Sequence, residues 1–251
     1  MKGRQKTGIT TCFESACKRR RPSRPRADCA RNNFHNPMQT RYKHIIWDWN
    51  GTIVDDAWLS VEVLNSILCD FSFPEISMES YRENFSFPVV DFYRSLGFDV
   101  SREKFEEIGR TFIARFNAKR YECLLQPGAL GLIAEIRGLN IPQSILSAYR
   151  TDFLEEAARH FGVLPYMSSI AGLDDIHANT KLERGLSHIS SLGVEPSEIL
   201  IIGDTDHDFS VARAAGTRCA LVARGHQSRA RLEKTGCPVF DILSPDIIAR
   251  A

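Results

Sequence analysis

The sequence lacks any apolar run that approaches the roughly 18 to 20 residues needed for a membrane-spanning helix. Its globular part has no internal repeat or low-complexity segment, and no apolar stretch follows the basic start as a secretory signal would require. These absences argue against a membrane-spanning, repeat-built or secreted chain. Of the 251 residues, 43% are apolar and 25% are charged. Such a chain can bury one sizeable core, with or without a small satellite domain.

The cysteines form no legible framework. There are seven, an odd number, with three in the first forty residues and no Cys-x-x-Cys pair. This pattern gives neither a zinc site nor a disulfide scaffold. We therefore expect a reducing, cytoplasmic location, with most cysteines of the globular part acting as small apolar residues.

Acidic residues are scarce at the N-terminus: the first 43 residues hold 12 Lys and Arg but only 2 Asp and Glu, a surplus of 10 positive charges. The remaining residues hold 20 basic and 29 acidic side chains, a surplus of 9 negative charges. The net charge of +1 is therefore a cancellation between two unlike regions.

Residues 1–40 show no apolar periodicity, and the tract from Lys18 to Arg26 combines repelling positive charges with two prolines. Such a segment cannot bury enough surface to offset the entropy of ordering, so we predict a disordered extension. Three interpretations stay open: a passive extension with translation starting at Met38, an Arg-rich targeting peptide, or a binding site for nucleic acid or another anionic surface. The passive extension is favoured over nucleic-acid binding, because short basic tracts are weak signals.

From residue 44 onward, β-rich runs alternate with helical periods, which is typical of a parallel sheet covered by helices. The expected strands are 44–49, 143–147, 169–172, 198–203 and 218–223, with a short strand at 239–240. The expected helices are 152–161, 181–192, 209–215 and 228–234. Right-handed crossovers would connect them into a doubly wound α/β sheet, with functional residues at the carboxyl ends of the strands.

The first two expected strands are separated by about ninety residues, far more than one crossover needs. Periodicity in this stretch predicts amphipathic helices at 61–71, 80–85, 89–96 and 102–121. In the last of them Phe105, Ile108, Phe112 and Phe116 recur at helical spacing, which is more typical of a core than of a ligand site. We therefore predict an α-helical cap domain at 57–126, inserted into a core domain of 41–56 and 127–251.

Four polar motifs fall where the expected strands end. The first is Asp48-Trp49-Asn50-Gly51-Thr52, and the others are Ser147, Lys181 and the run Gly203-Asp204-Thr205-Asp206-His207-Asp208. Alone, Asn50-Gly51 would favour a tight hairpin turn. In a parallel sheet, however, these ends share one edge, so the motifs predict a common site.

On these four motifs, in this order, the sequence resembles the haloacid dehalogenase (HAD) superfamily of phosphohydrolases, and within it the phosphoglycolate phosphatase-like members with a helical cap after the first motif. The resemblance covers about residues 44–240. It implies a phosphomonoester hydrolase that acts on a small phosphorylated metabolite through an aspartyl phosphate, with Mg²⁺ as cofactor. A carboxylate nucleophile splits hydrolysis into two steps, provided that a hard cation screens the repulsion between the two anions.

The resemblance also implies roles for individual residues. Asp48 would be the nucleophile, and the catalytic set would further contain Asn50, Ser147 and Lys181. The metal would be held by Asp48, the carbonyl of Asn50, Asp204 and Asp208. Phosphate and substrate contacts would come from Gly51, Thr52, Ser147, Ala148, Arg150 and Lys181.

Taken singly, several of these residues have ordinary structural interpretations. Ser147 could lie in a helix-cap region, Lys181 could be an exposed helix lysine, and Asp208 could be an acid favoured at a helix N-terminus. Arg150 could be a solvated charge. The four motifs together favour the functional interpretation, most strongly for Asp48 and Asp204.

The sequence departs from the family pattern at Asn50, where phosphatases of the family usually carry a second Asp that protonates the leaving oxygen and then activates water. An amide cannot exchange a proton at neutral pH, and acid-base catalysis is worth about 10² to 10⁴ in rate. Three hypotheses stay open: a good leaving group or a borrowed acid, a slow enzyme or phosphate-binding protein whose aspartyl phosphate persists, and deamidation of Asn50. The borrowed acid would be Asp55, Asp56, His207 or His226.

Overall fold

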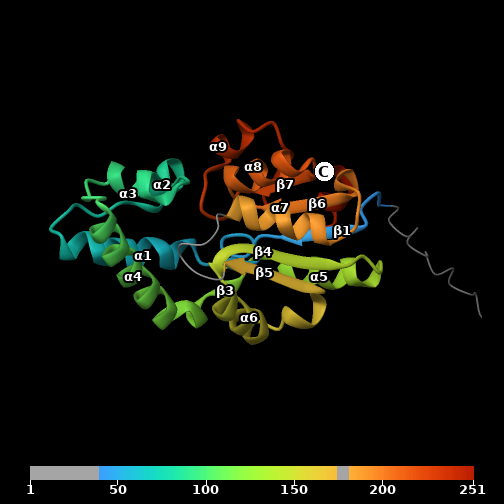
Figure 1. The fold of residues 1–251 in the computed structure, drawn as a ribbon, viewed down its shortest axis with the longest axis horizontal. Helices are drawn as coiled ribbons and strands as arrows, with labels where there is room; N and C mark the ends of the chain where they lie inside the picture. Colours follow the sequence, from blue (N-terminus) through green and yellow to red (C-terminus); the bar gives the residue numbers. More distant parts are fainter. Residues whose placement is uncertain (1–39, 174–180) are drawn as a thin grey trace, which may run out of the picture. The chain divides into compact units, whose positions relative to one another are not determined.

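Six parallel strands form the central sheet of the computed structural model, which describes residues 40–173 and 181–251 (Figure 1). Their order in the sheet is β5-β4-β1-β6-β7-β8. The strands are β1 His44–Trp47, β4 Gln143–Arg150, β5 Ser169–Leu173, β6 Ile199–Gly203, β7 Arg218–Val222 and β8 Val239–Phe240. The α/β parallel fold predicted from the alternation of elements is confirmed, whereas the extension predicted at 1–40 lies outside the described residues apart from its last one.

The four residues of β1 are all buried, and each is either apolar or hydrogen-bonded within the protein. This suits the position of β1 in the middle of the sheet. Ile45 and Ile46 project into two separate apolar clusters, one on each face, as the two-residue period of a strand requires. Trp47 pairs with Ile145 of β4 and Ile202 of β6. The residues that follow these strands therefore meet at one edge.

Helices cover both faces of the sheet. The face of Ile45 is packed by α5 Ala129–Gly138, α6 Thr151–His160 and α10 Asp246–Arg250. The face of Ile46 is packed by α7 Lys181–Ser191, α8 Asp206–Ala215 and α9 Arg229–Glu233. Within the described residues, no helix is long and apolar enough to cross a membrane.

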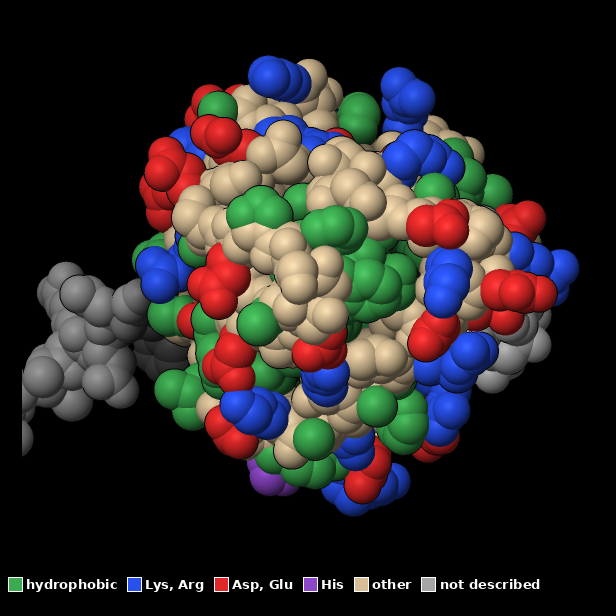
Figure 2. Space-filling view, turned by 90° about the vertical axis from the view of Figure 1, so that its left-hand side faces the viewer, with side chains coloured by type: hydrophobic (Ala, Val, Ile, Leu, Met, Phe, Trp, Pro, Cys, Tyr) green, Lys and Arg blue, Asp and Glu red, His purple; other side chains and the backbone are tan. Residues whose placement is uncertain are grey.

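The long insertion after β1 is helical, as predicted. It consists of α1 Ala57–Asp70, α2 Met78–Asn84, α3 Val89–Ser95 and α4 Arg102–Lys119, followed by a 3-10 turn at Arg120–Glu122. A two-stranded antiparallel ribbon, β2 Val54–Asp55 and β3 Leu124–Leu125, joins both ends of this insertion. Figure 2 views the molecule from the insertion's end, where charged side chains of both signs surround a central area of apolar side chains.

Several element boundaries differ from the sequence-based expectations. The strand β4 runs to Arg150, so Ser147 does not end it as predicted; an irregularity in the pairing between Leu146 and Arg150 lets the strand continue. The helix α8 begins at Asp206 instead of 209, and α1 begins at Ala57 instead of 61. The helices α5 and α10 and the ribbon of β2 and β3 were not expected.

Candidate active site

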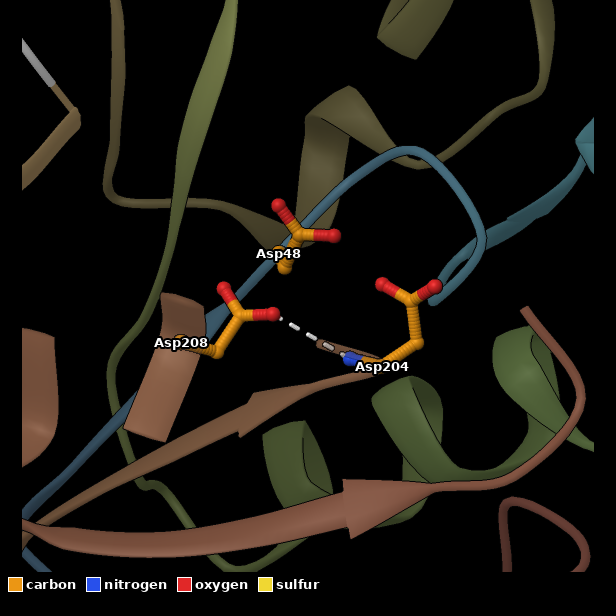
Figure 3. Close-up of side chains that lie close together, drawn as sticks. All are labelled: Asp48, Asp204 and Asp208. Carbon is orange, nitrogen blue, oxygen red and sulfur yellow. Dashed lines mark hydrogen bonds between the residues drawn. The ribbon is translucent and has the colours of Figure 1, made fainter. Parts of the chain in front are cut away.

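Three carboxylates from the segments that follow β1 and β6 meet at the edge of the sheet (Figure 3). Asp48 follows β1, Asp204 follows β6 and Asp208 lies in the first turn of α8. One oxygen from each lies within 4.8 Å of the others, and all three side chains are buried. Burying three like charges is costly unless cations neutralise them.

The start of α8 fixes Asp208. Its Oδ2 accepts hydrogen bonds from the Thr205 hydroxyl at 2.7 Å and from the Thr205 backbone N–H at 3.1 Å. The backbone N–H of Asp204 donates to the same oxygen at 3.3 Å. Asp208 is thus the helix N-terminal acid of the ordinary interpretation, while its other oxygen, Oδ1, faces the site.

Asp204 is held between two glycines that leave no room for a side chain. A Cβ at Gly51 would lie 2.2 Å from Asp204 Oδ2, and a Cβ at Gly225 would lie 2.0 Å from the same atom. The φ of +76° at Gly51 also favours glycine. The backbone N–H of His226 donates to this oxygen at 2.6 Å, which fixes the carboxylate against the loop after β7.

Lys181 supplies the positive charge inside the cluster. Its Nζ donates to Asp48 Oδ1 and, at 2.6 Å, to Asp208 Oδ1. The lysine is only 7% exposed, so it is not the solvated helix lysine of the ordinary interpretation. The fully buried Thr52 hydroxyl lies 3.1 Å from Asp48 Oδ2 and 3.2 Å from Asp204 Oδ1, so it contacts the carboxylates themselves.

The pKa shifts show how the charges balance. Burial raises the pKa of Asp48 well above its usual range, and it raises the pKa of Asp204 to about 6, with Asp208 adding to both shifts. Burial also opposes ionisation of Asp208 and Lys181, but the attraction between them outweighs it, lowering the pKa of Asp208 and raising that of Lys181. Lys181, with His226 as the other nearby cation, still leaves negative charge uncompensated near Asp48 and Asp204.

That surplus and the donor set fit a hard divalent cation. Carboxylate oxygens are the ligands that Mg²⁺ prefers, and Asp48, Asp204 and Asp208 offer three of them in one place. When bound, such a cation would neutralise charge between a phosphate and the carboxylates. The cluster is the only group of its kind among the described residues.

The Asn50 side chain lines the cavity and is paired with Asp56. Its Nδ2 donates to Asp56 Oδ2, and the backbone N–H of Gly51 donates to Asp56 Oδ1 at 2.7 Å. The His226 Nε2 lies 3.3 Å from Asp56 Oδ1, while Nδ1 lies 2.9 Å from the Tyr81 hydroxyl. Burial disfavours the charged imidazole, but the close contact with the Asp56 carboxylate outweighs it and raises the pKa of His226 to about 9.

Of the four residues considered as a borrowed acid, Asp56 and His226 line the cavity next to Asp48, whereas Asp55 and His207 are not among its lining residues. The His207 ring instead stacks on Phe87, with ring centroids 4.7 Å apart. The sequence alone did not show which of these four residues would line the cavity.

Of the other expected contact residues, two line this cavity, whereas Gly51 and Thr52 are not among its lining residues. Ser147 and Ala148 line it, and the Ser147 hydroxyl oxygen accepts from the Tyr149 N–H at 3.1 Å. Arg150 does not reach it: its Nε and Nη2 each donate to Asp152 at 2.5 Å, and the guanidinium lies 3.9 Å from the Phe153 ring. Arg150 lines a separate surface depression.

Three contributors to the site were not found by sequence reasoning. Gly225 leaves space for Asp204, Gln126 Nε2 donates to the Gly51 carbonyl at 3.0 Å, and Tyr81 contacts His226. Gln126 precedes Pro127-Gly128, where the sequence marked only the end of the cap. None of the three belongs to a polar motif at a strand end.

The central strand of the parallel sheet ends in a buried Asp, and further acids and a lysine lie around it. This fold and this set of donor groups are typical of α/β enzymes that process phosphate. The family model of haloacid dehalogenase-like hydrolases matches residues 45–222, which is most of the chain. The chain therefore belongs to the haloacid dehalogenase-like hydrolases, as the motifs predicted.

Curated relatives and solved structures agree with this family. The chain is 24% identical over 212 residues to a phosphoglycolate phosphatase from Synechococcus elongatus, covering 82% of this chain and 95% of the relative. It is 23% identical to the pyrophosphatase PpaX of Bacillus velezensis, covering 73% and 84%. A haloacid dehalogenase-like hydrolase from Streptococcus pneumoniae shares the fold with a TM-score of 0.68 and 20% identity, over 79% of this chain and 93% of that one. The expectation of a hydrolytic enzyme is confirmed.

Proposed function

We propose that this chain is a Mg²⁺-dependent phosphomonoester hydrolase that uses Asp48 as the nucleophile. The observation that carries the proposal is the cluster of Asp48, Asp204 and Asp208, in which Lys181 pairs with Asp48 and Asp208, beside a cavity that Asp48, Asp204 and Lys181 line. The names of the relatives, phosphoglycolate phosphatase and pyrophosphatase, support phosphate ester or anhydride chemistry without fixing the substrate.

In the first step an Asp48 oxygen would bond to phosphorus while the bond from phosphorus to the leaving oxygen breaks. Lys181 and the Ser147 hydroxyl would face the phosphoryl oxygens, where the transition state carries its charge. Water would then attack the phosphorus of phospho-Asp48 and release inorganic phosphate together with the free carboxylate. Asp204, Asp208 and the Asn50 carbonyl would complete the cation site with Asp48.

The test is phosphate release from p-nitrophenyl phosphate and acetyl phosphate, with Mg²⁺ and after its removal by a chelator. We expect Asp48→Asn to lower the rate by about 10³-fold or more, as loss of a nucleophile does elsewhere. The matched control is Asp241→Asn, which removes a carboxylate with 82% side-chain exposure and should leave the rate unchanged. Equal rates for Asp48→Asn and wild type would refute the proposal.

The hydrogen bond from Asn50 to Asp56 favours one alternative, a protein in which phospho-Asp48 persists and turnover is slow. Asn50→Asp separates it from an efficient enzyme, because a restored acid should raise turnover by about 10²-fold if the second step lacks acid-base catalysis. A burst of one phosphorylated Asp48 per chain in wild type would support the persistent intermediate. A wild-type rate equal to that of Asn50→Asp, with Asn50 shown intact by mass, would remove both persistence and deamidation.

A further inference from the structure

More than half of the residues that line the cavity next to Asp48 come from the cap, and many of these are aromatic. It has a volume of about 340 Å³, within the range of small-molecule sites. Asp48, Ser147 and Lys181 lie at one end of it. The cap contributes, among others, Tyr81, Phe85, Phe92, Phe105, Phe112 and Phe116.

The described part of the cap places no Lys, Arg, Asp or Glu in this lining. Lys181 is already shared by Asp48 and Asp208, and it would face the phosphoryl group of a substrate. The other cation in the described lining, His226, is already paired with Asp56, so a substrate with a second anionic group, such as a carboxylate, would lose its hydration without gaining an unpaired cationic partner. Burying a charge without a partner is unfavourable, so the lining selects against such substrates.

The hydroxyl groups in the lining are also largely occupied. The Tyr81 hydroxyl contacts His226 Nδ1 at 2.9 Å, and the Tyr149 hydroxyl donates to Asn117. A sugar phosphate would bury several hydroxyls that need partners, whereas an apolar ring needs none. Aromatic walls favour a flat ring, because edge and face contacts add to the burial of apolar area.

Asn50 independently restricts the leaving group. Its amide donates to Asp56 and cannot deliver a proton, so residue 50 gives the leaving oxygen none, and a leaving group that needs no proton is favoured. A phenolate can do so far more readily than an alkoxide, since the phenol of tyrosine has a pKa of about 10. The cavity lining and Asn50 therefore both favour a substrate with an aromatic leaving group.

We propose that the substrate is an aryl phosphate monoester, with its apolar aromatic group in the cap cavity and a phenolate as the leaving group; this rests on the proposed phosphomonoesterase function. The electron pair of the broken P–O bond goes to the phenolate. Water supplies the oxygen for inorganic phosphate, and its proton is taken up by the phenolate after release.

Gly109 offers a way to test the cavity. It lies in α4 and lines the cavity, and a Cβ there would meet no other atom within 4 Å. Gly109→Leu therefore fills space that the ring of the substrate would occupy without overlapping protein atoms at Cβ. Gly131→Leu is the matched control, because it lies in α5, is exposed, and also has open space at Cβ.

The experiment compares kcat/KM for 1-naphthyl phosphate, phenyl phosphate and phosphoglycolate. We expect 1-naphthyl phosphate to exceed phenyl phosphate by about tenfold in wild type, which is 1.4 kcal/mol from the second ring, and to exceed phosphoglycolate by more. Gly109→Leu should bring the naphthyl-to-phenyl ratio close to one, and Gly131→Leu should preserve it. A wild-type ratio near one, a ratio unaffected by Gly109→Leu, or preference for phosphoglycolate would overturn the inference.

A separate measurement tests the proposed phenolate leaving group. Asn50→Asp should raise kcat for 2-phenylethyl phosphate, whose leaving group is an alkoxide, at least tenfold more than kcat for 1-naphthyl phosphate. Equal gains would overturn this part of the proposal. If p-nitrophenyl phosphate is hydrolysed in an Asp48-dependent way but the naphthyl preference is missing, only the substrate inference fails. If no ester is hydrolysed, the proposed function fails as well.

Discussion

Two glycines that are far apart in the sequence determine the position of Asp204. Gly51 follows the first strand and Gly225 follows β7, and each would place a Cβ within 2.2 Å of Asp204 Oδ2. The carboxylate therefore needs the space that the two glycines leave, and the His226 N–H holds it there. The motif around Gly51 was legible in the sequence, because it adjoins Asp48. Gly225 was not, since its requirement arises only where two loops meet in space.

We predict that Gly225→Ala displaces the Asp204 carboxylate, because the new Cβ would lie 2.0 Å from Oδ2. Affinity for Mg²⁺, measured by calorimetry, should fall by at least about tenfold, and the free energy of unfolding should fall by about 1–3 kcal/mol, as overpacked cores do. Gly131→Ala is the control: it removes a glycine from an exposed helix position and should leave Mg²⁺ affinity unchanged. Wild-type Mg²⁺ binding by Gly225→Ala would contradict this account of Asp204.

Among the elements, β1, β4 and α7 are linked by a buried polar contact far from the carboxylates. His44 Nε2 and His188 Nε2 each lie 2.8 Å from the Ser144 hydroxyl. The hydroxyl can donate to one ring and accept from the other, which suits two neutral imidazoles. Burial lowers the pKa of His44 to about 4, with His188 contributing, and burial also lowers the pKa of His188.

This contact predicts a loss of stability in acid. The folded pKa of His44 is depressed below the unfolded value, so its contribution is complete above pH 6.5 and is lost as the pH falls toward 4. At about 1.4 kcal/mol per pKa unit, the loss is up to about 3 kcal/mol. Urea unfolding at pH 7 and pH 4.5 should show a smaller drop for His44→Gln than for wild type. His160→Gln, at an exposed helix end, should retain the wild-type drop, and equal drops in all three proteins would rule out this role for His44.

For the molecule as a whole, the sequence predicted the sheet and the helical insertion well, because both rest on local periodicity. The strands at 199–203 and 218–222 lie within one residue of expectation at each end. Elements that depend on distant partners were missed: β2 and β3 are two residues each and exist only through their pairing. The contact between Asn50 and Asp56 was equally hidden, since it follows from the turn after β1 and not from either residue type.

The helical insertion contacts the rest of the molecule at several places, and one of them is the loop after β7. Arg82 of α2 donates from Nε to the Gly225 carbonyl at 2.9 Å and from Nη2 to the Arg224 carbonyl at 2.8 Å. The backbone N–H of Ser228 returns a bond to the Arg82 carbonyl at 3.0 Å. The loop that fixes Asp204 thus also holds α2 of the helical insertion in place.

We therefore predict that Arg82→Met loosens the cap without unfolding the sheet. Two hydrogen bonds from a charged donor are lost, so amides in α2 and α3 should exchange with deuterium about tenfold faster or more, while those of β1 and β6 keep their protection. Arg94→Met is the matched control, because Arg94 pairs with Asp91 within α3 and has 58% side-chain exposure. Unchanged exchange in α2 after Arg82→Met, or the same acceleration after Arg94→Met, would show that the loop after β7 does not hold α2 in place.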